Sequence, residues 1–212
     1  VEGVPVQSDQ AYEPVNLVLG KTATASDVYF DNKDYDGSKA VDGVRSYKDD
    51  DDRNPDGTPK TKESRWATGD NTRKAWLEVD LGGPVTFNKA MIDECVSWGP
   101  RIDDYRIEFW ADGEWKTAFA GKGAGANATA SFDAVTADKV RLHILNCLPG
   151  VTGGPSVWDF GLYMDGALAE LQVDGVPVPG FDPGVFSYTV GRTLGSTPVI
   201  TAKLAYLANG CE

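Results

Sequence analysis

The chain has few of the residues from which most enzyme sites are built. Its 212 residues include a single histidine, and no segment resembles a nucleophile elbow, a phosphate-binding glycine loop or a Ser/His/Asp set. His143 alternates with Leu142 and Ile144, which predicts an outward, solvated position in the middle of a strand. Acid pairs are abundant, but abundance alone does not place two carboxyls around a glycosidic bond. We therefore expect a domain that is not catalytic.

Positive charge and long apolar runs are also scarce. The sequence has 20 basic and 32 acidic residues, a net charge of −12, and so lacks the electrostatic footprint for a phosphate backbone. Nucleic acid is an excluded partner, and an anionic membrane is a poor one. No apolar run approaches the roughly 20 residues of a membrane span, and no signal segment stands at Val1. We interpret the sequence as a soluble piece of a processed chain, monomeric within a multidomain protein.

Cysteine is too rare for a disulfide framework, and the spacing of the three cysteines fits no zinc site. Cys95 and Cys147 each follow a strand-like run, so they could be neighbours at one end of a sheet. The sequence permits one bridge between them or two buried free thiols. Cys211, one residue from the end, is not expected to pair.

The clearest pattern present is the run from Ala75 to Gly82. Leu77, Val79 and Leu81 alternate with Trp76, Glu78 and Asp80, which predicts a strand with one buried face. The Gly-Gly-Pro at 82–84 predicts a turn after it. Shorter β-patterned runs follow at 85–93, 105–110, 114–119, 128–132 and 140–145, and the run at 153–163 is expected to supply the closing strand.

No segment shows a sustained helical stripe, so the pattern predicts an all-β fold, an antiparallel jelly-roll β-sandwich. Residues 111–113 (Ala-Asp-Gly) predict a tight hairpin. Residues 46–63 are polar and rich in turn residues, and we interpret them as a solvated insertion. Four aspartates at 49–52 lack the spacing of a twelve-residue calcium loop and are interpreted as a charge run.

Composition predicts three parts. Residues 1–15 are polar and aperiodic, a leader or linker, and residues 16–165 form the main domain. A new β pattern over 166–212 has about 47 residues, near the lower limit for a stable domain. We expect it to be a partial second β domain, either the first half of a truncated sandwich or a segment that leans on the first domain.

The main domain resembles the coagulation factor 5/8 type C, or discoidin-like, domain, and in particular the family 32 carbohydrate-binding modules of bacterial glycosidases. The matching pieces occur in the family's order: NLVLGKTATAS, AVDG, SRWAT, AWLEVDLG, FNKAMI, RIDDYRIEFWADGEWK, TADKVRL and PSVWDF. The resemblance implies an eight-stranded, galactose-binding-domain-like jelly roll whose loops bind glycan ends. The tail from Leu168 resembles the start of the immunoglobulin-like or cadherin-like modules that space domains in secreted bacterial enzymes.

The resemblance also implies a structural calcium ion. Family members hold it between the AVDG loop, the residue before the RW pair and the acid of the final strand, by carboxylates and carbonyls of the kind that calcium prefers. Carried onto this sequence, the expected ligands are Lys39 and Trp158 through their main-chain carbonyls, and Asp42, Ser64 and Asp159. The second acid that the final strand usually carries is replaced by Gly161. The alternative is that Asp42 caps a turn and Asp159 pairs with a base.

A sugar site needs an aromatic face and planar polar groups that bond adjacent hydroxyls. The loop from Glu94 to Arg101 offers both, and the family places a binding arginine there. We expect the sugar-binding residues to be Trp98, Arg101, Tyr29, Phe30, Asp31, Tyr35, Glu94 and Asn146. Alternatively, Arg101 pairs with Glu94 and Trp98 packs under its loop. The histidine that galactose-preferring relatives often use has no counterpart.

The resemblance implies a non-catalytic carbohydrate-binding module of a secreted or cell-surface bacterial glycoside hydrolase, with a fucosidase as a possible parent. The expected partners are terminal galactose, N-acetylgalactosamine or fucose-containing glycans of the host. The alternative is a discoidin-type adhesion domain that binds a protein or cell-surface partner.

Overall fold

The computed structural model describes residues 15–165, 168–181 and 198–204 of the chain. They divide into a compact unit of Asn16–Met164 and a second unit that takes in the strands after Asp165, and each unit is described by itself. The predicted leader before Val15 and the run of β residues at 186–190 lie outside the described residues.

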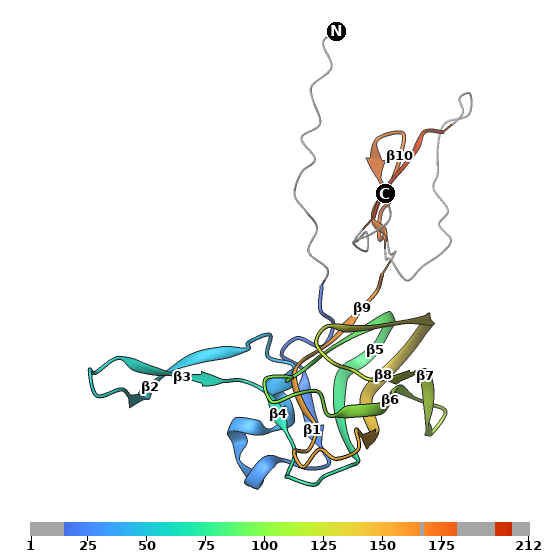
Figure 1. The fold of residues 1–212 in the computed structure, drawn as a ribbon. Helices are drawn as coiled ribbons and strands as arrows, with labels where there is room; N and C mark the ends of the chain where they lie inside the picture. The colour runs from blue at the N-terminus through green and yellow to red at the C-terminus, as the bar shows by residue number, and fades with distance from the viewer. Residues whose placement is uncertain (1–14, 166–167, 182–197, 205–212) are drawn as a thin grey trace. The chain divides into compact units, whose positions relative to one another are not determined.

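The first unit is built on antiparallel strands, as the alternation of apolar residues predicts (Figure 1). Seven of them form one hydrogen-bonded network with the order β4-β9-β5-β8-β6-β7, and β1 pairs with β5. Their bounds are β1 Thr22–Ala25, β4 Trp66–Ala67, β5 Ala75–Glu94, β6 Ile102–Ala111, β7 Glu114–Lys122, β8 Ala128–Cys147 and β9 Ser156–Tyr163. The expected all-β class and jelly-roll architecture are confirmed.

Strands β5 and β8 are much longer than the short runs that the sequence predicts. Each spans 20 residues, and β5 runs through the Gly-Gly-Pro where we expected a turn. There the four residues 81–84 face the single residue Asp138 of β8, so the segment is a bulge in one bent strand. Gly82 and Gly83 have φ angles of +78° and +146°, which permit this geometry because glycine has no Cβ.

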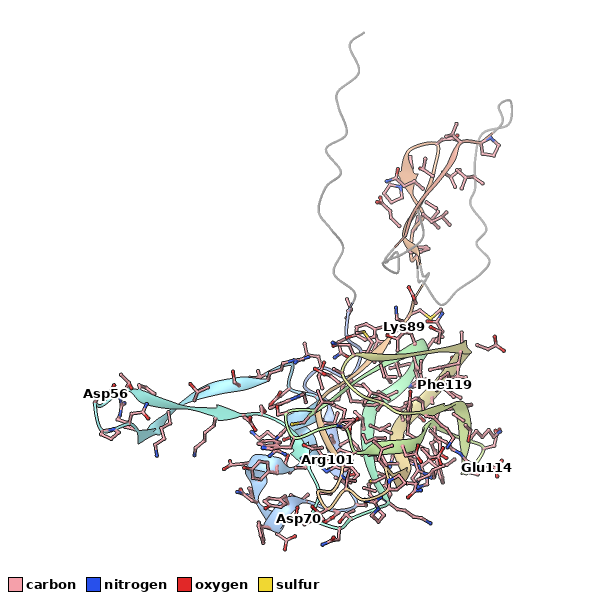
Figure 2. The ribbon with its side chains drawn as sticks, in the orientation of Figure 1. Asp56, Asp70, Lys89, Arg101, Glu114 and Phe119 are labelled. Carbon is pink, nitrogen blue, oxygen red and sulfur yellow. The ribbon has the colours of Figure 1, made fainter. Side chains whose placement is uncertain are left out.

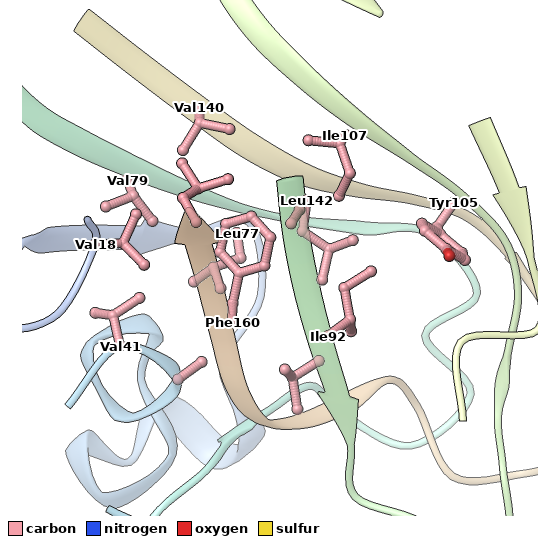
Figure 3. Packing of buried hydrophobic residues seen from close by; sticks show 14 of the residues in the cluster. Val18, Val41, Leu77, Val79, Ile92, Tyr105, Ile107, Val140, Leu142 and Phe160 are labelled. Atoms are coloured by element: carbon pink, nitrogen blue, oxygen red, sulfur yellow. The ribbon is translucent and has the colours of Figure 1, made fainter. Parts of the chain in front are cut away.

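The apolar face of β5 forms the middle of the core (Figure 3). Leu77 and Val79 are fully buried and Leu81 nearly so, as the alternation predicts. After the second irregularity of β5, between Phe87 and Lys89, the buried apolar residues are even-numbered, beginning with Ala90. The bulges therefore allow both halves of β5 to bury one face in the core, although the buried apolar residues change from odd-numbered to even-numbered along the strand.

The sequence permits either a disulfide between Cys95 and Cys147 or two buried free thiols, and the structure has the second arrangement. Cys95 and Cys147 are both free and buried, so no bridge joins them. The Sγ of Cys147 lies 3.6 Å from the main-chain oxygen of Arg73, and burial raises the pKa of this thiol. No described helix is long and apolar enough to cross a membrane.

The polar insertion forms a hairpin of its own. Strands β2 (Ser46–Arg53) and β3 (Pro59–Glu63) pair only with each other, and the arm extends from the body of the unit with Asp56 near its tip (Figures 1 and 2). At the base, the N–H of Ser64 donates to the carbonyl of Arg45 at 3.0 Å. The insertion therefore leaves and rejoins the fold at neighbouring points.

One polar cluster lies on the outward side of the sheet. His143, which we expected to be solvated, is 27% exposed, and its Nδ1 lies 3.1 Å from Oε2 of Glu108. The same carboxylate oxygen accepts a hydrogen bond from Nε of Arg141 at 2.5 Å. The outward position in the middle of a strand is as predicted, but the ring is only partly solvated because β6 carries a buried acid beside it, which alternation along β8 cannot reveal.

The second unit contains a three-stranded sheet with the order β11-β10-β12. The strands are β10 Leu168–Val173, β11 Val176–Pro177 and β12 Ile200–Leu204. A tight turn at Asp174 and Gly175, both with positive φ, joins the first two. A second, partial β sheet is therefore present, and its likeness to an immunoglobulin-like module stays a prediction.

The glycine bulge of β5 gives a first prediction. We expect Gly83→Ala to lower the free energy of unfolding by about 1–3 kcal/mol, because a φ near +146° is strained for any residue with a Cβ. Urea denaturation of the purified protein measures the change. Gly69→Ala is the matched control, since its φ is ordinary and the nearest atoms to an added Cβ lie 3.6 Å away. If the two variants were equally stable, the strained φ that the bulge requires at position 83 would be contradicted.

Candidate functional site

A cavity of about 490 Å³ lies where several loops of the first unit meet. Its volume is in the range of pockets that hold small ligands. The wall combines aromatic rings with two arginines and two acids. The lining residues are Tyr29, Tyr35, Glu63, Arg65, Ala67, Thr68, Asp70, Trp98, Arg101 and Gly154. Figure 2 labels Arg101 and Asp70.

The first aromatic wall comes from short 3₁₀ turns after β1. Turns η1 (Tyr29–Asp31) and η2 (Lys33–Tyr35) are joined at Asn32, whose side chain accepts a hydrogen bond from the N–H of Asp34 at 3.0 Å. Such Asx caps hold a turn without burying apolar residues. The rings of Tyr29 and Tyr35 meet edge to face with centroids 5.6 Å apart. The Asn32 cap therefore holds the turn that carries Tyr35, and Tyr29 packs against the ring of Tyr35.

The second wall is the loop after β5, and a buried carboxylate holds it. Glu94 is fully buried, and its Oε1 accepts the main-chain N–H groups of Arg101 at 2.5 Å and Ile102 at 2.9 Å. Its Oε2 accepts the N–H of Gly125 at 2.8 Å. Three amides satisfy this carboxylate, so Glu94 supports the loop from below and does not line the cavity.

Trp98 and Arg101 present their side chains at the cavity. Trp98 is 62% exposed, so it does not pack under its loop. The guanidinium of Arg101 donates to the carbonyl of Gly154 at 3.0 Å and lies 5.9 Å from the centre of the Trp98 ring. Arg101 meets Glu94 through its main-chain N–H, whereas the side chain reaches the cavity. An open indole face beside a guanidinium can stack on a sugar ring and bond its hydroxyls.

The structure brings four of the eight predicted sugar-binding residues together at the cavity: Trp98, Arg101, Tyr29 and Tyr35. The other four lie elsewhere. Phe30 is 82% exposed and packs against Tyr29, and Asp31 is exposed beside it. Asn146 is exposed at the end of β8, opposite Asp104, and Glu94 is buried. None of these four lines the cavity.

Sequence reasoning missed several lining residues, chiefly Glu63, Arg65 and Asp70. Arg65 is the second residue of the SRWAT piece that carries the family resemblance, and this position was its only signal. Glu63 ends the insertion, and Asp70 follows the short strand β4. Asp27, which does not line the cavity, accepts hydrogen bonds from the N–H of Gly69 at 3.0 Å and from Thr72 Oγ1 at 2.6 Å. The loop that carries Asp70 is thereby fixed from below.

Three of the five predicted calcium ligands, Asp42, Ser64 and Asp159, lie close together outside the lining of this cavity. Ser64 Oγ donates to Oδ2 of Asp42 at 2.5 Å, and Oδ1 of Asp42 accepts the N–H of Val44. Oδ1 of Asp159 is buried and accepts no hydrogen bond. Burial and, next, the nearby Asp42 carboxylate raise the pKa of Asp159, while Arg45 opposes this. An unsatisfied buried oxygen beside a second carboxylate is what a cation would satisfy.

Asp93 is an acid that the sequence did not nominate here. It is the register partner of Asp159, and both line a small cavity of about 130 Å³. The guanidinium of Arg45 pairs with it. Among the described residues no three His, Cys, Asp or Glu side chains are placed to hold a metal ion by themselves. A cation would therefore also need Ser64 Oγ and the main-chain carbonyls of Lys39 and Trp158, and this mixed oxygen set fits calcium.

Known proteins resemble this chain in both sequence and fold. Residues 39–142 match the F5/8 type C family model described as "NedA-like, galactose-binding domain". Among solved structures, chitosan-binding module 1 of a chitosanase/glucanase from Paenibacillus sp. IK-5 is 27% identical, with a TM-score of 0.55. The match covers 70% of this chain and 98% of that module.

Two further matches involve fucosidases. A GH29 fucosidase from Ruminococcus gnavus, solved with fucose, shares the fold at 23% identity and a TM-score of 0.55, over 71% of this chain and 26% of that one. A rice protein (Oryza sativa subsp. japonica) named as an alpha-L-fucosidase is 26% identical over 102 residues. The match covers 48% of this chain and 19% of the rice protein, so this chain corresponds to about a fifth of that protein's length.

The support under the Trp98 loop gives a second prediction. We expect Glu94→Ala to lower the free energy of unfolding by about 2–4 kcal/mol, because three main-chain N–H groups lose a buried acceptor. Chemical denaturation measures it. Glu114→Ala, an exposed acid at the start of β7, is the control and should change stability by less than about 0.5 kcal/mol. A small loss for Glu94→Ala would show that its contacts do not hold the loop.

Proposed function

We propose that the F5/8 type C domain formed by residues 16–164 is a non-catalytic module that binds the ends of glycans, and that it targets a parent glycoside hydrolase to them. The domain is of the carbohydrate-binding-module type, related to chitosan-binding modules and to domains of fucosidases. The parent's activity, its secretion and its bacterial origin belong to the proposal. So does an immunoglobulin-like spacer role for the second unit.

The observation that carries the proposal is the exposed Trp98 ring at the edge of a cavity lined by two tyrosines and two arginines. Sugar rings present C–H groups on one face and hydroxyls around the rim, so they match an aromatic surface flanked by planar donors. The cavity has equal numbers of acids and cations among its lining residues, which suits a neutral sugar.

We propose terminal galactose, N-acetylgalactosamine or fucose as the bound sugars. The description of the matched family supports galactose, and the rice relative named as a fucosidase supports a parent that acts on fucosylated glycans. The name of the Paenibacillus module adds chitosan oligomers to the ligands worth testing.

Glycan-array binding of the purified protein tests the function. We expect Trp98→Ala to weaken binding at least about tenfold, because an aromatic platform at a sugar site contributes more than about 1.4 kcal/mol. Trp110→Ala is a matched control, since Trp110 is also exposed, at 38%, but does not line the cavity. A blank array together with capture of a defined protein partner would favour the adhesion domain instead. Full binding by Trp98→Ala would exclude this cavity.

We also propose that calcium binds at Asp42, Ser64 and Asp159, with the main-chain carbonyls of Lys39 and Trp158. When bound, the ion would neutralise two neighbouring carboxylates. The hydrogen bond from Ser64 to Asp42 ties the loop after η3 (Gly37–Ala40) to the segment that precedes β4. Because Ser64 is adjacent to Arg65 in the sequence, the proposed calcium site lies next to a residue that lines the sugar cavity. The role proposed is structural.

Calorimetry with and without chelator tests the ion. We expect calcium at about a hundred times its Kd to raise the Tm by roughly 5–10 °C, since a ligand of the folded state alone contributes about 2.7 kcal/mol at that excess. Asp159→Asn should abolish the response while raising the Tm of the chelated protein, because it removes a buried charge beside Asp42. Asp112→Asn, an exposed acid far along the chain, should keep the response. An unchanged Tm in wild type would contradict calcium binding.

A further inference from the structure

Arg65 is the most constrained cation at the sugar cavity. Its side chain is only 12% exposed, and it directly precedes strand β4. Nε lies 3.1 Å from Oε2 of Glu63, and Nη1 donates to Ser156 Oγ at 2.7 Å. Ser156 is fully buried and donates in turn to the carbonyl of Trp66 at 3.1 Å. Two partners therefore fix the plane of the guanidinium from two sides.

The same guanidinium contacts an aromatic ring from each wall of the cavity. Its central carbon lies 4.9 Å from the centre of the Tyr35 ring and 5.2 Å from the centre of the Trp98 ring. Tyr35 belongs to the 3₁₀ turns after β1, and Trp98 to the loop after β5. Tyr35 and Trp98 have no ring contact of their own among the described residues. Arg65 is the shared neighbour of the two walls.

We infer that Arg65 is a positioning residue of the sugar cavity, which fixes the spacing and tilt of Tyr35 and Trp98. Its planar group can stack on both rings while its edge bonds Glu63 and Ser156, a combination that lysine cannot reproduce. Arg65 acts through the rings, whereas Arg101, whose side chain donates to Gly154 alone within the described part of the chain, keeps donors for a sugar. The inference rests on the proposed function and explains how its site keeps its shape.

The anchoring of Arg65 also gives the insertion a part in the site. Glu63 is the last residue of β3, so the hairpin supplies the carboxylate that orients Nε. Ser156 begins β9, the strand that carries Asp159. The orientation of one guanidinium thus depends on the end of the hairpin, two residues away, and on the start of β9, which is distant in the sequence.

Ring positions and sugar affinity together test the role of Arg65. With 5-fluorotryptophan incorporated at the six tryptophans, the ¹⁹F signal of Trp98 is assigned through Trp98→Phe. We expect Arg65→Met to shift or broaden the Trp98 signal without any ligand. In titrations with D-galactose, N-acetyl-D-galactosamine and L-fucose, it should weaken binding about tenfold or more. Arg65→Lys should not restore affinity.

Arg141→Met is a matched control. Arg141 has the same kinds of contact, with Nε on Glu108 at 2.5 Å and its guanidinium 4.4 Å from the centre of the Trp115 ring, and it is 17% exposed. It does not line the cavity. We expect this variant to change the Trp115 signal and to leave that of Trp98 and the sugar affinity unchanged. If Arg141→Met weakened binding as much as Arg65→Met, general loss of stability would explain both results.

A double-mutant cycle between Arg65→Met and Tyr35→Ala separates positioning from direct contact. We expect the double variant to lose less affinity than the two single losses multiplied, because both changes disturb the same wall. Independent effects, or a folded Arg65→Met with an unchanged Trp98 signal, would overturn the inference. If wild type bound none of the three sugars, the proposed ligands would fail, and the ligand-free ¹⁹F comparison would still decide the role of Arg65.

Discussion

The pairing of β5 with β8 is the constraint on which the rest of the structure depends. These two 20-residue strands pair from Ala75 to Ile92, and every other strand of the large sheet except β4 and β7 pairs directly with one of them. Irregularities in the register bend them and change which side of β5 is buried. The loop with Trp98 begins where β5 ends, so the geometry of this pair decides where the proposed sugar site can form.

The proposed sugar and calcium sites are built from loops, and buried or partly buried polar side chains beneath such loops replace the missing apolar packing. Glu94 satisfies three amides under the Trp98 loop, and Asp27 bonds Gly69 and Thr72 under the Asp70 loop. Each buried acceptor would be costly if it lost its partners, so each fixes one arrangement of its loop. A cavity that is rigid before binding loses less conformational entropy when a sugar arrives.

Alternation and turn residues predict the class of the fold and the buried face of β5, because both depend on neighbours along the chain. They predict neither the bulge at Gly83 nor the pairing of His143 with Glu108, since these depend on a strand distant in the sequence. For the cavity, the aromatic residues Tyr29, Tyr35 and Trp98 were predictable as polar-loop aromatics near a family motif. Arg65 and Asp70 were not, because a polar residue beside a short strand has no pattern that distinguishes a lining position from a solvated one.

The base and the tip of the hairpin formed by β2 and β3 differ in how well they can tolerate chemical modification. Its base lies beside both proposed sites, since Ser64 bonds Asp42 and Glu63 bonds Arg65. Its tip near Asp56 is exposed, and the turn there is closed by local bonds such as that from the N–H of Thr58 to Asp56. The tip is therefore a natural point for attaching a fluorophore or an affinity tag, or for immobilising the protein on a sensor, with the proposed sugar cavity left accessible.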